Sequence, residues 1–197
     1  MTVSQSLELI AETFGVANWN TLAAAIHSAA FDRRKSVLPL PPPGDEGGPT
    51  VRFSPELQAT LHRAFGFARR RMHEYTTLEH LLLALIEDAD ASGAMKACNV
   101  DLATLNDAVA GDLDIELKEL VTADGEATGP TAAFQRVVQR AVVHVRASGG
   151  QTVTGVQLVL AIFAERESPA VHFLIEQALT RQDVAHVLAH GIGKGGV

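Results

Sequence analysis

The chain has 197 residues, 47% of them hydrophobic, and a formal net charge of −7 at pH 7. This length can bury one sizeable core, and the negative charge argues against nucleic acid or an anionic membrane as a partner. The single cysteine, Cys98, excludes an intramolecular disulfide, and we interpret it as a small buried hydrophobic residue. Because the sequence has neither a signal-peptide pattern nor an apolar run of about eighteen residues, we expect a cytoplasmic protein.

Residues 1–32 are predicted to form a helical hairpin that is broken at Gly15. Apolar residues recur at helical spacing on both sides of this glycine. They are Leu7, Ile10, Ala11 and Phe14 before it, and Trp19, Leu22, Ala23 and Ile26 after it. Two helices this short bury too little surface to be stable alone, so the hairpin either adds a layer to the rest of the protein or docks on a partner. In the second case Trp19 is a candidate partner contact.

Residues 33–50 are predicted to form a linker. The segment starts with three basic residues and continues with prolines at Pro39 and Pro41–Pro43, followed by glycines. Such a sequence continues neither a helix nor a sheet, and proline-rich chains are extended and semi-rigid. The spacing of the prolines also fits a peptide ligand for a proline-binding domain, but we interpret the segment as a spacer.

Residues 51–191 contain an internal duplication, which we divide into copies at 53–120 and 131–191. A constant offset of 77 residues superimposes identical residues of the two copies without a gap. The matched pairs include Gln58 and Gln135, Arg63 and Arg140, Ala64 and Ala141, Arg69 and Arg146, Thr77 and Thr154, and Leu81 and Leu158. Because each copy carries several helix signals, the pattern predicts an all-α fold of two similar bundles in a pseudo-twofold pair, with a flexible tail at 192–197.

The helices are predicted from their capping residues and apolar stripes. Ser54 and Pro55 open the first helix of the first copy, and Thr131 opens its counterpart in the second. Thr76 with Glu79, and Thr154 with Gln157, have capping-box spacing ahead of two apolar central helices. Further helices are expected at 92–98, from Asp101 towards 113, at 168–179 and at 180–190.

The residues suggest no catalytic chemistry. The sequence has no nucleophile elbow, no zinc-protease motif, no phosphate-binding lysine loop and no dinucleotide turn, so we expect neither enzymatic activity nor a cofactor. His186 and His190 are four residues apart and can share a helix face, but a metal site needs a third ligand that the sequence does not identify. Whether a metal binds there stays open at this point.

The duplicated region resembles the amino-terminal domain of the Clp/Hsp100 unfoldases, most nearly that of the ClpA type. The resemblance covers Phe53 to Gly191. The matching motifs of the first copy are His73–Tyr75, Thr76–Leu85 and Ala97–Leu102, and those of the second are Pro130–Thr131, Phe134–Val145, Val153–Gly155 and Ala161–Phe163. This resemblance implies a pseudo-twofold pair of four-helix repeats without catalytic activity. The hairpin and the proline linker are additions to the family's pattern, and we expect the chain to lack the ATPase modules that follow this domain in unfoldases.

The resemblance also implies a function and a binding site. Domains of this family receive substrates or adaptors, notably the adaptor ClpS, so we expect a non-enzymatic adaptor or regulator of a Clp protease that binds a ClpS-like adaptor, the unfoldase or its substrates. The family's adaptor contacts match Glu74 and Glu79, expected at the exposed beginning of the central helix, and Thr131 and Arg136. The alternative roles are a helix cap for Glu79 and a solvated charge for Arg136. The alternative function is a module that binds peptides or small molecules between the repeats, independently of Clp.

Overall fold

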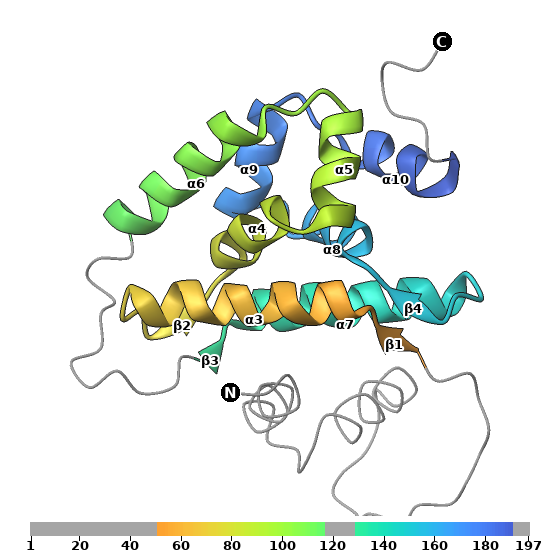
Figure 1. The fold of residues 1–197 in the computed structure, drawn as a ribbon, viewed down its shortest axis with the longest axis horizontal. Coiled ribbons are helices and arrows are strands. Elements are labelled where there is room, and N and C mark those ends of the chain that lie inside the picture. The colour runs from red at the N-terminus through yellow and green to blue at the C-terminus, as the bar shows by residue number, and fades with distance from the viewer. Residues whose placement is uncertain (1–50, 117–128, 191–197) are drawn as a thin grey trace, which may run out of the picture.

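The computed structural model describes residues 51–116 and 129–190. Within these ranges the chain forms eight helices joined by very short strands (Figure 1). In chain order the elements are β1 (Arg52–Phe53), α3 (Pro55–Arg70), β2 (Tyr75–Thr76), α4 (Leu78–Ile86), α5 (Ala89–Ala97), α6 (Leu102–Glu116), β3 (Gly129–Pro130), α7 (Ala132–Ala147), β4 (Thr152–Val153), α8 (Gly155–Ile162), α9 (Pro169–Glu176) and α10 (Arg181–His190).

The order of the elements confirms the duplication, because four helices of the first copy recur in the second. Helices α3 and α7 have the same length and are offset by the 77 residues found in the sequence. Each begins at the predicted cap, since Ser54 Oγ accepts the Leu57 N–H and Thr131 Oγ1 accepts the Phe134 N–H. The last two helices of each copy, α5 with α9 and α6 with α10, begin at slightly larger offsets because the loop before α9 is longer than the loop before α5.

Two parallel strand pairs join the copies. Strand β1 of the first copy pairs with β4 of the second, with Arg52 opposite Thr152, and β2 of the first copy pairs with β3 of the second, with Tyr75 opposite Gly129. Exchanging the copies turns each pair into the other, which is the behaviour of a pseudo-twofold arrangement. The prediction of an all-α fold missed these strands, because a two-residue strand carries no readable alternation of apolar and polar residues.

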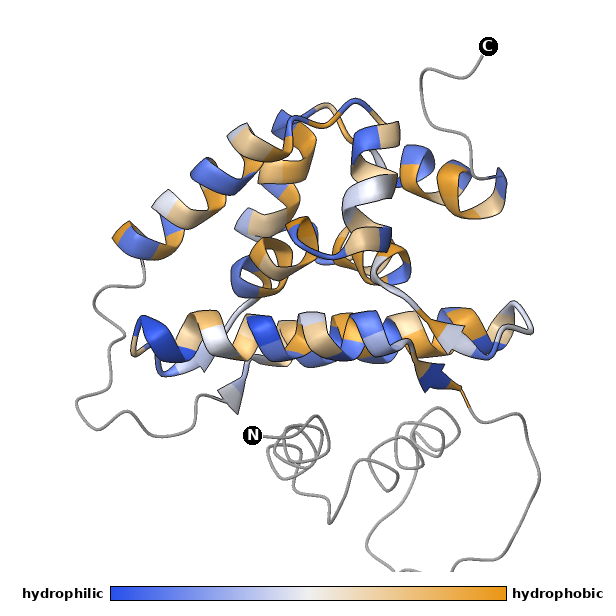
Figure 2. Cartoon of the chain, viewed as in Figure 1, coloured by the Kyte–Doolittle hydropathy of each residue, from blue (hydrophilic) through white to orange (hydrophobic). Residues whose placement is uncertain are grey.

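The core lies between α4 and α8, which occupy the middle of the molecule. Helices α3 and α7 run along one side of them, and the remaining helices cover the other side (Figure 1). All of Leu78–Leu85 is buried, and α8 is buried along almost its whole length. Helices α3 and α7 show alternating apolar and polar patches (Figure 2), as expected of helices with one buried face. Phe65 of α3 and Phe134 of α7 are in contact, with ring centroids 5.6 Å apart.

Two helix starts differ from the predicted ones. The first central helix is capped by Thr77, whose N–H donates to His80 Nδ1, and not by the predicted pair Thr76 and Glu79. Thr76 is unavailable as a cap because it belongs to β2. The second capping box, Thr154 with Gln157, is confirmed. Helix α5 begins before the predicted residue 92, because Asp88 accepts the Ala91 N–H and caps it.

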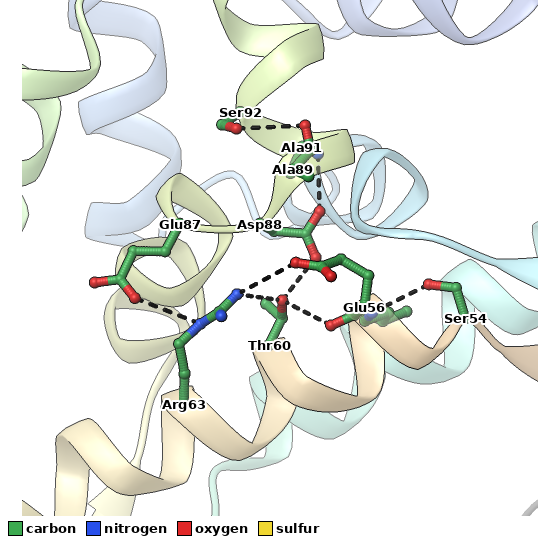
Figure 3. A network of polar contacts seen from close by, with 10 residues as sticks. Ser54, Glu56, Thr60, Arg63, Glu87, Asp88, Ala89, Ala91 and Ser92 are labelled. Atoms are coloured by element: carbon green, nitrogen blue, oxygen red, sulfur yellow. Dashed lines mark hydrogen bonds and ion pairs between the residues drawn. The ribbon is translucent and has the colours of Figure 1, made fainter.

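A buried polar cluster joins α3 to the start of α5 (Figure 3). The Asp88 side chain is fully buried, and its Oδ2 accepts a hydrogen bond of 2.6 Å from the Thr60 hydroxyl. Arg63 Nη2 donates to the same hydroxyl (2.8 Å). The Asp88 carboxylate also lies against Gly155, where a Cβ would overlap it. Gly155 begins α8, so this cluster ties the first copy to the second.

Several predictions concern residues outside the described ranges. These are the hairpin at 1–32 with Trp19, the linker at 33–50, the continuation of the first copy to residue 120, and the tail at 192–197. In the part of the chain that the structure describes, no helix has the length and apolar character needed to span a membrane.

Candidate functional site

The turn between α3 and α4 is exposed and carries an acidic and an aromatic side chain. Helix α3 ends at Arg70, Met72 follows with a left-handed backbone (φ 57°), and Glu74 and Tyr75 lead into β2. Tyr75 is 46% exposed, and Glu74 is also exposed. The Glu74 carboxylate hydrogen-bonds the Tyr75 hydroxyl and thereby raises the pKa of Tyr75. The turn therefore offers a negative charge beside an apolar ring.

Two buried histidines support this turn from inside. His73 Nδ1 lies 3.0 Å from His80 Nε2, and both side chains are almost completely buried. Because the Thr77 N–H donates to His80 Nδ1, the proton of neutral His80 is on Nε2 and points to His73. Burial lowers the pKa of His80 to about 3, and the charges of His73 and Arg71 act in the same direction. Both rings are therefore neutral near pH 7, and their contact links His73, which precedes Glu74, to His80 and the Thr77 cap at the start of α4.

The start of α7 lies beside this turn. Strand β2 pairs with β3, and the Thr131 N–H donates to the Thr76 carbonyl (3.0 Å). Thr131 caps α7, and Arg136 follows little more than one turn further along that helix. Four of the predicted partner-binding residues lie in the described region. Three of them lie at the β2–β3 pair or on α7, which follows β3: Glu74, Thr131 and Arg136.

Arg136 is held by a carboxylate of its own copy. Its Nε and Nη2 donate to the two oxygens of Glu165 at 3.2 and 2.6 Å, and Arg140 Nη1 donates to one of them at 3.0 Å. The Arg136 side chain is 52% exposed, whereas that of Glu165 is 12% exposed. Hydrogen bonds from Arg136 lower the pKa of Glu165, so this carboxylate stays ionised. Arg136 is thus an exposed cation with a fixed direction.

Glu79 does not lie at the exposed beginning of its helix, as we had expected. It is 7% exposed, and its Oε1 accepts hydrogen bonds from the Ser168 hydroxyl (3.1 Å) and the Ala170 N–H (3.2 Å). Glu79 of the first copy therefore caps α9 of the second, where a carboxylate also suits the positive end of the helix. Glu79 thus caps a helix of the other copy, and not the start of its own helix, where the sequence predicted a cap.

The comparison with protein families decides what this fold is. The family profile described as the Clp repeat (R) N-terminal domain matches residues 52–177. The chain belongs to this family. The match begins at β1 and ends after α9, so it contains both strand pairs and all the site residues of the described region.

Known proteins of this family give the same assignment. A ClpA homolog protein of Fuscovulum blasticum is 48% identical over 157 residues, which are 79% of this chain and 20% of that protein. The chain thus spans about one fifth of the length of that relative. The N-terminal domain of the ClpV1 ATPase of E. coli has a similar structure, with a TM-score of 0.60 at 18% identity over 73% of this chain and 88% of that one.

A further similar structure is a complex of the ClpV N-domain with a VipB peptide. Its TM-score is 0.54 at 17% identity, over 69% of this chain and 84% of that one. At this identity the likeness shows the fold alone.

Sequence reasoning missed two features of the site described above, the role of Glu165 and the pairing of His73 with His80. Glu165 was not singled out, although the 77-residue offset places it on Asp88, another acidic residue that contacts its first helix. His73 and His80 each adjoin a glutamate in the sequence, whereas the structure pairs the two histidines with each other. The offset could have revealed Glu165; nothing local could have revealed the pairing of the histidines.

The two histidines near the C-terminal end of the domain show no metal-binding geometry. The rings of His186 and His190 stack, with centroids 4.6 Å apart. In residues 51–116 and 129–190, no group of three His, Cys, Asp or Glu side chains comes together as a metal site would require.

Proposed function

We propose that this Clp N-domain protein is a non-enzymatic regulator of a ClpAP-type protease. It binds a ClpS-like adaptor, the unfoldase or its substrates through the surface formed by Glu74, Tyr75, Thr131 and Arg136. The observation that carries the proposal is the β2–β3 pairing, which brings the acidic turn and the start of α7 together within a fold that belongs to the Clp N-domain family.

This surface fits a partner that carries both basic and acidic groups. Glu74 is exposed and attracts a basic group, and Arg136 is exposed and presents its guanidinium to a carboxylate or carbonyl. The exposed Tyr75 ring, next to Glu74 in the chain, supplies apolar area of the kind that anchors protein interfaces. A folded adaptor offers basic, acidic and apolar groups on one surface. Such an interface gains mainly in specificity and association rate from its charges.

The test is calorimetric titration of the protein with a ClpS-like adaptor. We expect Glu74→Lys to weaken binding by roughly tenfold, because it replaces attraction by repulsion at an exposed site. Glu176→Lys is the matched control, since Glu176 is also exposed but lies at the last residue of α9. Equal affinities for Glu74→Lys and the unchanged protein would rule out this surface as the adaptor site.

A second candidate is peptide binding that is independent of Clp partners. It is favoured by the related ClpV N-domain, whose structure is a complex with a VipB peptide. Affinity capture with the intact protein separates the two functions. Recovery of an adaptor or unfoldase supports the first, and recovery of neither, together with saturable binding of a peptide, supports the second.

The predicted hairpin at 1–32 gives the regulator a second contact through Trp19. Degradation of an N-degron substrate by ClpAP in the presence of ClpS tests this role. We expect the full chain and a chain starting at Thr50 to change the degradation rate differently, because only the first can hold a second partner. Identical rates would remove the hairpin from the function.

A further inference from the structure

Two carboxylates take part in holding the connection between α8 and α9, residues 163–168: Glu79 of the first copy, and Glu165 of the connection itself. At its end, Ser168 donates its hydroxyl to Glu79, which reaches across from the first copy. In its middle, Glu165 receives the guanidinium groups of Arg136 and Arg140. The Ser168 N–H donates to the Glu165 carbonyl (2.9 Å), so the two anchored residues belong to one tight turn.

This turn links a buried residue to an exposed one. Glu79 is almost inaccessible, whereas Arg136 lies on the surface proposed to bind the partner. Glu165 is also tied to α8, because its N–H donates to the Ile162 carbonyl (2.9 Å). If the start of α9 loses its bond to Glu79, the turn keeps that tie to α8 and loses the side-chain bond that holds its other end. A displaced Glu165 cannot meet both the Nε and the Nη2 of Arg136, since the paired geometry requires the two groups to be coplanar.

We propose that Glu79 and Glu165 are positioning residues for Arg136: Glu79 fixes the turn at 163–168, and Glu165 within that turn sets the direction of the Arg136 guanidinium. The inference rests on the proposed function only in giving Arg136 a partner to contact. It assigns to Glu79 an indirect part in binding, through a helix cap between the copies, in place of a direct charge contact. Fixing a long side chain before binding lowers the entropy that the complex loses.

The first experiment needs no partner and observes the Arg136 Nε–H group by NMR in the intact protein. We expect a sharp signal that is protected from exchange, because the Glu165 carboxylate accepts this N–H. Glu165→Gln should broaden or shift the signal, and Glu79→Ala should do the same from a distance. Glu79→Gln keeps an oxygen acceptor for Ser168 and should preserve most of it. Thermal unfolding of each variant verifies that it is folded.

Glu74→Gln is the matched control, because Glu74 lies outside the bonded path from Glu79 to Arg136. We expect its Arg136 signal to equal that of the unchanged protein. An unaltered Arg136 signal in folded Glu79→Ala would overturn the role of Glu79. An unaltered signal in Glu165→Gln would overturn the whole inference, whether or not an adaptor binds.

The second experiment measures adaptor affinity in a double-mutant cycle with Arg136→Ala. We expect Glu79→Ala alone to weaken binding by between about twofold and tenfold, the effect of releasing one long side chain. In the Arg136→Ala background the same change should have no further effect, because the side chain that it positions is absent. An undiminished loss in that background would show that Glu79 acts independently of Arg136. Absence of adaptor binding would refute the proposed function and leave the NMR result standing.

Discussion

At the scale of single residues, the exposed turn depends on two histidines that stay uncharged. The corresponding position of His80 in the second copy is Gln157, whose Oε1 accepts the Thr154 N–H at 2.7 Å. A glutamine can therefore cap this kind of helix without titrating. His80 differs in that its other nitrogen bonds His73, next to Glu74. In the first copy, His80 therefore both caps α4 and, through His73, supports the turn that carries Glu74.

This difference predicts a dependence of stability on pH. The folded pKa of His80 is lowered to about 3 from 6.5, and that of His73 is also lowered. The stability is therefore fully present above about pH 6.5 and is lost as the pH falls, because the unfolded chain takes up protons that the folded one refuses. Between pH 6.5 and its folded pKa of about 3, His80 lowers the free energy of unfolding by about 1.4 kcal/mol per pH unit.

Denaturant unfolding at pH 7, 6 and 5 measures this loss. We expect His80→Gln to lower the free energy of unfolding at pH 7, because His73 loses its donor, and to reduce the loss between pH 7 and 5. His172→Gln replaces an exposed histidine and should keep the original pH dependence. If His80→Gln retained the full loss, the paired histidines would not be its source.

The position of Glu79 was predicted wrongly, because its surroundings depend on residues far away in the sequence. Its position after a capping threonine fits an exposed first turn, and the resemblance assigned it to the partner surface. Its actual hydrogen-bond partners, Ser168 and Ala170, lie in the other copy, 89 and 91 residues further along the chain. No local pattern contains that information, because it depends on how the two copies pack.

At the scale of elements, the helices were predicted well where polar caps and apolar stripes agree. The first residues of α3, α7 and α8 were predicted from their N-caps, which are Ser54, Thr131 and the Thr154–Gln157 capping box. The two-residue strands were missed, and α5 was predicted to begin at residue 92, because Asp88 was not recognised as its cap. Helix α4 has its own C-cap at Glu87, directly before Asp88, so one helix follows the other without a loop that would mark the boundary.

The helix ends repeat between the copies even where their residues differ. Left-handed backbone occurs at Met72 after α3 and at Gly149 after α7, and again at Asn99 after α5 and Ala178 after α9. Glycine and asparagine adopt this conformation readily, whereas alanine pays a steric cost of about 1 kcal/mol. The backbone conformation of Ala178 therefore destabilises the folded protein.

Replacing Ala178 by glycine should raise the free energy of unfolding by up to about 1 kcal/mol, since it removes this cost, less the greater chain entropy of glycine. Thermal or denaturant unfolding is the measurement. Gly149→Ala is the reciprocal control and should lower stability by a similar amount, because its φ of 74° becomes strained and a Cβ there meets no other atom. A destabilised Ala178→Gly would contradict this account.

At the scale of the whole molecule, the copies are held together at their helix starts. Glu79 of α4 caps α9, and Asp88 at the start of α5 packs against Gly155 of α8. These two contacts occupy related places in the pseudo-twofold arrangement but use different chemistry. The first is a hydrogen-bonded cap, and the second is a close approach that only glycine permits.

Gly155→Ala should therefore lower the free energy of unfolding by about 1–3 kcal/mol, as overpacking of a tight interior does. Its Cβ would overlap the Asp88 carboxylate and lie 3.0 Å from the Ala91 Cβ. Gly111→Ala in α6 is the control, because a Cβ there meets nothing within 4 Å, and we expect it to stabilise the protein by about 0.5–1 kcal/mol. Calorimetric melting distinguishes the two, and a neutral Gly155→Ala would show that the copies can separate slightly at no cost.

Each strand pair takes one strand from each copy, so a single copy on its own would lack both pairs. Neither copy closes a strand pair by itself, because β1 and β2 of the first each need a partner from the second. Two separate molecules of one copy would meet the same need by pairing with each other, each giving one strand to either junction. The single chain thus has the arrangement of a dimer of two similar copies that are covalently joined. The copies differ in sequence: the first has Glu79 and His80 at the start of its central helix where the second has Val156 and Gln157.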